Sequence, residues 1–133
     1  MNIVEIEGIG PAYAEKLVGA GVRTTEDLLE KGATSQGRED LATTTGIGTG
    51  LILDWVNHVD LMRIHGVGPE FAEMLEKAGV DSIPELAQRN PQNLHVKLME
   101  VNEGMKIANR TPGLSEVEKW ISEADTLPRT VHH

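Results

Sequence analysis

The chain has 133 residues, with 21 acidic and 12 basic side chains and a formal net charge of −9. Such acidity opposes phosphate binding, because most affinity of proteins for nucleic acids comes from Lys and Arg displacing counterions. The absence of cysteine excludes disulfides, thiol catalysis and thiolate metal sites. No apolar run approaches the roughly 18 residues of a membrane span, and no basic-then-apolar signal region opens the chain. We therefore expect a cytoplasmic protein that does not enter membranes.

Aromatic side chains make up only 3% of the residues. A core of Leu, Val, Ile, Ala and Met suits packed helices better than a sheet of β-branched and aromatic strands. The composition therefore predicts an all-α fold.

The first elements are helices bounded by proline, glycine and capping residues. Pro11 opens a predicted helix over 12–20, and Gly21 follows where a C′ glycine ends a helix. Thr24 is then a suitable N-cap for a short helix over 25–30.

The next two elements surround a second glycine turn. Ser35 is expected to open a helix that ends before Gly46. The turn Gly46-Ile47-Gly48 then leads into a long apolar helix that carries Trp55.

The beginning of the chain recurs 58 residues later, since aligning 6–28 with 64–86 gives 11 identities in 23 positions. A period of this size indicates a duplicated supersecondary unit. We predict two tandem repeats of about 58 residues in a single domain over 1–133: repeat one at 6–62, repeat two at 64–127 and a tail at 128–133. No role is assigned to His132 and His133 in that tail.

The second repeat follows the order of the first. Pro69 opens a helix that Gly79 ends, and Ser82 is the N-cap of the next helix. Asn90 and Pro91 begin a further helix that is expected to stop at a break over 102–104. Its apolar positions are Leu94, Leu98, Met99 and Val101. After a segment without counterpart, Pro112-Gly113 precedes a last helix in which Trp120 takes the place of Trp55.

Short turns that contain two glycines and one aliphatic residue are typical of the helix-hairpin-helix motif. Glycine permits positive φ and leaves backbone N–H groups unobstructed at a helix N-terminus, where the helix dipole favours a phosphate oxygen. The aliphatic residue between the glycines is expected to enter the core at Ile9, Ile47 and Val67. The structural hairpin positions are Gly8, Gly10, Pro11, Gly66, Gly68 and Pro69.

Several motifs resemble the bacterial family known as domain of unknown function 4332. They include Gly8-Ile9-Gly10-Pro11, Asp60-Leu61-Met62-Arg63-Ile64 and the run from Glu85 to Asn102. The resemblance extends from Ile6 to Leu127, and it implies a helical fold with no established activity.

The glycine turns differ in their fitness for phosphate. Acidic residues such as Glu15 and Glu70 flank the first and third turns, and a carboxylate there repels an incoming phosphate. The second turn lies in a stretch without charge, and the fourth lies next to the one net-basic stretch, residues 89–110. The candidate phosphate contacts are therefore Gly46, Gly48, Thr49, Gly50, Lys106, Arg110 and Gly113.

No other residues indicate chemistry. Trp55 and Trp120 are expected to be anchors of the core or of a protein interface. No catalytic residue, metal ligand or cofactor is expected, because no carboxylate lies in an apolar setting or beside a nucleophile.

Two functions stay open for this chain. The first is a non-enzymatic interaction module that binds an unidentified protein. The overall acidity of the chain and the acids beside the first and third glycine turns favour this function. The alternative is weak binding of nucleic acid through the phosphate backbone, without reading bases. The oligomeric state stays open.

Overall fold

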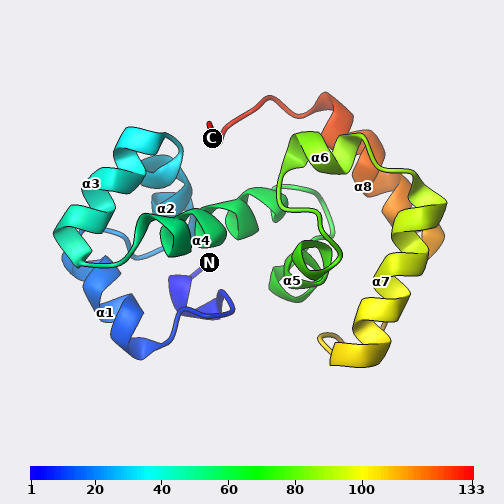
Figure 1. Cartoon of the computed structure of the whole chain (residues 1–133), viewed down its shortest axis with the longest axis horizontal. Coiled ribbons are helices and arrows are strands. Elements are labelled where there is room, and N and C mark those ends of the chain that lie inside the picture. Colours follow the sequence, from blue (N-terminus) through cyan, green and yellow to red (C-terminus); the bar gives the residue numbers. More distant parts are fainter. The chain divides into compact units, whose positions relative to one another are not determined.

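The computed structural model describes residues 1–133 and contains eight α-helices after a short 3-10 helix (Figure 1). Asn2 and Thr24 form an isolated antiparallel bridge, and no strand is present. The predicted all-α fold is confirmed. None of the helices combines the length and the apolar character that crossing a membrane requires.

The chain divides into two compact units, Met1–Asp60 with Thr130–His133 and Leu61–Arg129. The first unit contains η1 (Ile3–Glu5), α1 (Pro11–Gly19), α2 (Thr25–Gly32), α3 (Ser35–Thr45) and α4 (Thr49–Leu61). The second contains α5 (Pro69–Lys77), α6 (Ile83–Ala87), α7 (Pro91–Met105) and α8 (Leu114–Thr126). The division after Asp60 lies beside the predicted boundary between the repeats. A single domain over 1–133 stays a prediction.

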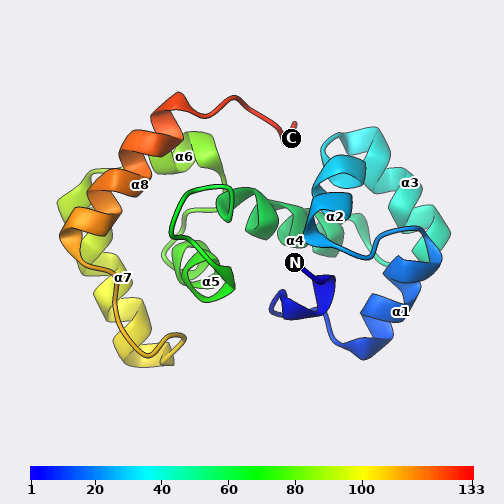
Figure 2. The same ribbon diagram turned by 180° about the vertical axis from the view of Figure 1, so that it is seen from behind.

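Within each unit a helix packs on the helix before it or on the one before that. In the first unit α3 packs against α1 and α2, and in the second unit α7 packs against α5. The last helix, α8, packs against both α6 and α7 (Figure 2). Each unit thus has its own internal helix contacts.

Prolines and glycines begin and end the helices as predicted. Pro11 and Pro69 are the first residues of α1 and α5, and the preceding glycines are their N-caps. Gly21 and Gly79, which follow the ends of these helices, have φ of 86° and 94°. A side chain at either glycine is strained in this left-handed conformation.

The helix α3 begins at Ser35, as predicted, and the residue before it supplies the cap. Thr34 is the N-cap, and its hydroxyl accepts a hydrogen bond of 3.0 Å from the N–H of Gly37. Ser35 is the first residue inside the helix. Both residue types cap helices well, so the sequence alone did not decide between them.

The predicted break at residues 102–104 is wrong, because α7 continues to Met105. The helix ends at Lys106, whose φ of 51° is left-handed and whose N–H donates to the Asn102 carbonyl at 2.8 Å. The side-chain oxygen of Asn102 accepts a further bond of 2.9 Å from the Ala108 N–H. Asn102 thus stabilises the chain beyond the helix from a position inside it.

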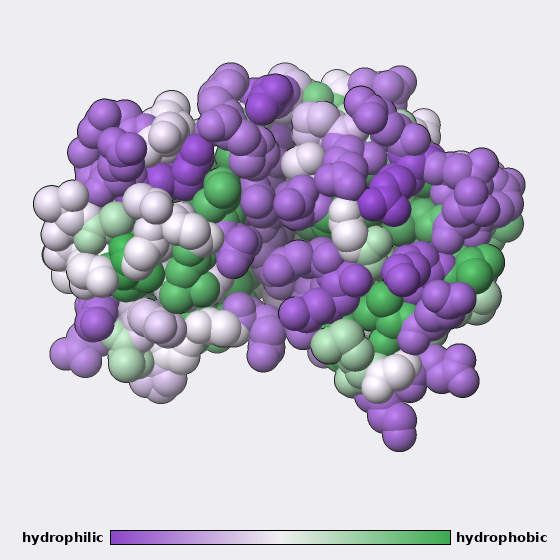
Figure 3. Space-filling view, in the orientation of Figure 1, coloured by the Kyte–Doolittle hydropathy of each residue, from purple (hydrophilic) through white to green (hydrophobic).

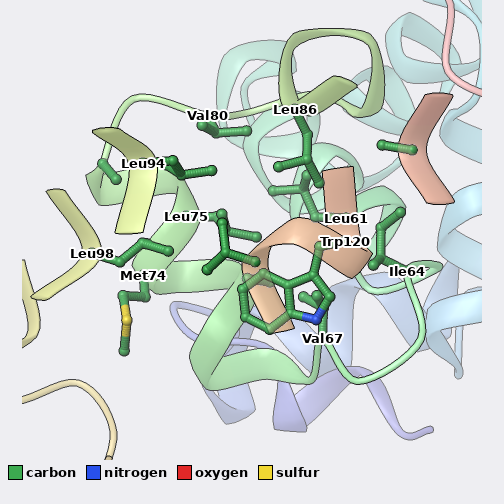
Figure 4. Close-up of a cluster of buried hydrophobic side chains, with 14 of the residues drawn as sticks. Leu61, Ile64, Val67, Met74, Leu75, Val80, Leu86, Leu94, Leu98 and Trp120 are labelled. Carbon is green, nitrogen blue, oxygen red and sulfur yellow. The ribbon is translucent and has the colours of Figure 1, made fainter. Parts of the chain in front are cut away.

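Buried aliphatic side chains form the cores, while much of the surface in Figure 3 is hydrophilic. Ile9, Ile47 and Val67, the aliphatic residues of the glycine turns, are 3%, 4% and 5% exposed, as predicted. Figure 4 shows the core of the second unit, in which the side chains of α5, α6, α7 and α8 converge. Its largest fully buried members are Leu61, Ile64, Met74, Leu75, Leu86, Leu94 and Leu98.

The last residues of the tail are part of the first unit. Val131 is only 2% exposed, and the backbone of His132 is hydrogen-bonded to Ala33 and Arg38. His132 and His133, to which the sequence assigned no role, therefore contribute to a packed structure.

Candidate functional site

The first and third glycine turns join helices and carry acids, as expected. Gly10 and Gly68 are the N-caps of α1 and α5, and no side chain caps either helix. Glu70 lies in the first turn of α5, so its carboxylate already interacts with the positive end of the helix dipole. The third turn is therefore a poor place for a phosphate, whereas α1 has no acidic residue in its first turn.

The second turn is open at Gly48, Thr49 and Gly50. All three residues are exposed, and nothing lies within 4 Å of a Cβ added at either glycine. They stand at the start of α4, where the first backbone N–H groups have no intrahelical acceptor. The start of α4 therefore has open space beside both glycines.

Gly46 does not contribute to that opening and is wrongly placed among the predicted phosphate contacts. It ends α3 with a φ of 75°, and its N–H donates to the Ala42 carbonyl at 2.8 Å. The neighbouring Thr45 hydroxyl donates to the Leu41 carbonyl at 2.6 Å and accepts from the Ile47 N–H at 3.1 Å. The N–H groups before Gly48 are therefore already used.

The fourth turn is occupied by a carboxylate of the chain itself. Gly113 is the N-cap of α8, and its N–H donates to Glu116 Oε1 at 3.0 Å. The guanidinium of Arg110 donates two hydrogen bonds to the same carboxylate, at 2.7 Å and 3.0 Å. Its guanidinium also lies 5.2 Å from the centre of the Phe71 ring. Arg110 and Gly113 are thus not available for a phosphate while this contact persists, which corrects the prediction.

Glu116 was not singled out by the sequence, although a signal existed. It stands three residues after the N-cap Gly113, the spacing at which an acidic side chain reaches back to the cap N–H. The hydrogen bonds from Arg110 and then from Gly113 hold the pKa of Glu116 at about 2, below its ordinary value of 4.5.

This lowered pKa predicts an effect of pH on stability. Because the folded pKa lies below the unfolded one, the contact stabilises the fold above about pH 4.5 and is lost as the pH falls towards 2. The two side chains are 60% and 37% exposed, so we expect Glu116→Gln to lower the free energy of unfolding by about 0.5–1 kcal/mol at pH 7. Urea unfolding at several pH values tests this, with Glu118→Gln as the control. A difference that persists at pH 2 would contradict the assignment.

Lys106 and the second turn belong to different units. The backbone of Lys106 ends α7 in the second unit, whereas Gly48, Thr49 and Gly50 belong to the first unit. The seven candidate phosphate contacts are thus divided between the two units, and among those of the first unit Gly48, Thr49 and Gly50 are exposed at the start of α4.

The two tryptophans are core residues, and the alternative of a protein interface is corrected. Trp55 and Trp120 are 3% and 2% exposed, so neither indole offers a surface to a partner. Trp55 makes an edge contact with Tyr13 at 5.2 Å between ring centres, and Trp120 contacts Phe71 at 5.5 Å.

A glycine lies beside each indole in the same way. A Cβ added at Gly8 lies 3.5 Å from Trp55 Nε1, and a Cβ added at Gly66 lies 3.4 Å from Trp120 Nε1. The two glycines have φ of 90° and 87°. The equivalence predicted from the sequence thus holds for these contacts.

Exposed apolar residues on α7 were missed by the sequence analysis. Val96 was not noticed, and Met99 was assigned to the apolar positions of the helix, yet they are 49% and 41% exposed. Counting turns of the helix would have placed Val96, two residues from both Leu94 and Leu98, on the face opposite them.

No group of three or more His, Cys, Asp or Glu side chains has an arrangement that could hold a metal ion.

Comparisons with known proteins agree with the motifs that the sequence displays. No solved structure matches the chain. The model of one family, described as Domain of unknown function (DUF4332), matches residues 7–127. Since this match covers most of the sequence, the chain belongs to the DUF4332 family.

Proposed function

We propose that this chain is a non-enzymatic interaction module of the helix-hairpin-helix type, and that its ligand is another protein. The observation that carries the proposal is the outer face of α7. A helix that exposes apolar side chains on the face opposite its core has surface for a second packing partner.

Apolar side chains lie on both the buried face and the outer surface of α7. Leu94 and Leu98, which face the core, are 1% and 0% exposed. Val96 and Met99 are about half exposed and three residues apart, so they are neighbours on the outer surface of the helix. Met is also suited to partners of irregular shape, because its side chain is flexible and polarisable.

The charge distribution supports a protein ligand over nucleic acid. The net charge is −9, and Arg110, one of the few bases near a glycine turn, is paired with Glu116. Arg89 is likewise paired with Glu85 at 3.0 Å. Both pairings reduce the positive charge that can displace counterions from a phosphate backbone.

A pair of variants tests the α7 surface. We expect the full chain to retain a discrete protein from its native extract, and Val96→Glu with Met99→Glu to reduce retention at least tenfold, because charges replace the apolar contact. The control, Ser115→Glu with Ser122→Glu, adds the same charge at exposed positions of another helix, α8, and should retain the partner. Both double variants should keep the helical content, since the four residues are exposed. Equal retention by all three proteins would refute this surface.

Weak nucleic-acid binding is the second candidate, and the open N-terminus of α4 favours it. The test is the anisotropy of a labelled mixed-sequence duplex at roughly 50 and 200 mM salt, where phosphate contacts predict weaker binding at the higher salt. Gly48→Glu should abolish that binding, because a carboxylate then competes for the same N–H groups. Gly104→Glu, at another unobstructed glycine, is the matched control. Binding that survives Gly48→Glu would exclude α4 as the site.

A further inference from the structure

The C-terminal segment Thr130–His133 is held to the first unit by its backbone. The His132 N–H donates to the Ala33 carbonyl at 2.8 Å. The His132 carbonyl accepts from Arg38 Nη2, also at 2.8 Å. His133 Nε2 lies 2.8 Å from Asn57 Oδ1, and the Val131 side chain is 2% exposed. The segment thus binds as an extended peptide with one buried apolar side chain.

Arg38 is the main polar residue of this contact. It is only 5% exposed, and its second nitrogen, Nη1, donates to the Gly32 carbonyl at 2.8 Å. A buried guanidinium needs acceptors for its N–H groups, because an unpaired buried donor is unfavourable. Without the segment, Nη2 loses the His132 carbonyl and must find water. The surface around Arg38 is therefore more favourable when a peptide carbonyl covers it.

We propose that Ala33, Arg38 and Asn57 form a docking site for the segment Thr130–His133, and that the same segment of a second copy of this chain binds there when the chain's own segment is displaced. The segment follows α8 through residues 127–129, which form no helix or strand. Its contacts are the same whichever copy supplies it, as in other exchanges of a terminal element between identical chains. The chain's own segment has the advantage of an effective concentration in the millimolar range.

Two full-length variants test the proposal, one with an altered segment and one with an altered docking site. Val131→Asp keeps the site but places a charge on the buried side chain of the segment. Arg38→Met keeps the segment but removes the donor to His132 at nearly the same volume. We expect each variant alone to be a monomer at about 0.1–1 mM in analytical ultracentrifugation. We expect the equimolar mixture to form a one-to-one complex, because the intact segment of one variant can bind only to the intact site of the other. A mixture that stays monomeric, with both variants folded by circular dichroism, would overturn the exchange between copies.

A peptide keeps the proposal testable if Arg38→Met does not fold. The probe is a synthetic peptide of residues 127–133, titrated into the Val131→Asp chain and followed by backbone amide shifts in NMR. We expect saturable shifts at Ala33, Arg38 and Asn57, and binding about threefold or more weaker to the unaltered chain, whose own segment competes. The control is the same peptide with aspartate in place of Val131. Absence of shifts up to roughly 1 mM peptide, or equal binding of the control peptide, would overturn the docking site.

Discussion

Replacement of Gly37 by alanine is expected to lower the free energy of unfolding by about 3 kcal/mol, because the added methyl group has no space. A Cβ at Gly37 collides with the carbonyl oxygen of Lys31 in α2 and lies 3.2 Å from the Thr34 hydroxyl. The carbonyl belongs to the backbone, so it cannot turn away as a flexible side chain can. Separation of α2 and α3 would then be required to relieve the overlap. Urea unfolding followed by circular dichroism at 222 nm measures the change.

Gly104→Ala is the matched control for this substitution. Gly104 also lies inside a helix, α7, and nothing is within 4 Å of a Cβ added there. Since alanine favours a helix over glycine by about 1 kcal/mol, we expect Gly104→Ala to be neutral or to stabilise the protein. A loss below about 1 kcal/mol for Gly37→Ala would show that the two helices can move apart at little cost.

Trp120→Ala is expected to have the other large effect, a loss of about 3–5 kcal/mol, because it empties the largest side-chain volume in the second core. Trp120 is 2% exposed and lies in the buried cluster of Figure 4. It contacts Phe71, and Gly66 lies beside its indole nitrogen. Its removal deprives α5 and α8 of a shared contact and leaves a cavity that these neighbours only partly fill. The free energy of unfolding from urea titration is again the readout.

Met99→Ala tests whether the loss of stability in Trp120→Ala comes from the burial of the side chain or only from its apolar character. Met99 is 41% exposed and also lies in the second unit, so its truncation should change the free energy of unfolding by no more than about 0.5 kcal/mol. Comparable losses for Trp120→Ala and Met99→Ala would contradict the assignment of Trp120 to the core and of Met99 to the surface.

The helices were largely predictable because their signals are local. Proline at the first position, Thr24, Ser82 or Asn90 at the N-cap, and glycine after the C-cap act within one or two turns of the chain. The one helix error arises where a local signal is ambiguous. At Asn102 a polar residue that resembles a break is used inside α7.

The candidate site was less predictable because its partners meet through the fold. Residue type places Arg110 near a glycine turn, but the contact with Glu116 requires the loop before α8 to bring them together. Burial of Trp55 and Trp120 is likewise a property of packing, since the same residue type serves cores and interfaces. Gly48 and Gly50 keep the predicted opening because no side chain reaches them.

By itself, the sequence determined the helical class, the duplicated glycine turns, the caps and the membership of the DUF4332 family, because these depend on residue type and spacing. Only the tertiary structure decided that Trp55 and Trp120 are buried in cores and where the segment Thr130–His133 binds. Each of these depends on side chains or segments outside one helical turn. Arg38 and His132 are 94 positions apart, and no local pattern encodes a contact over that separation.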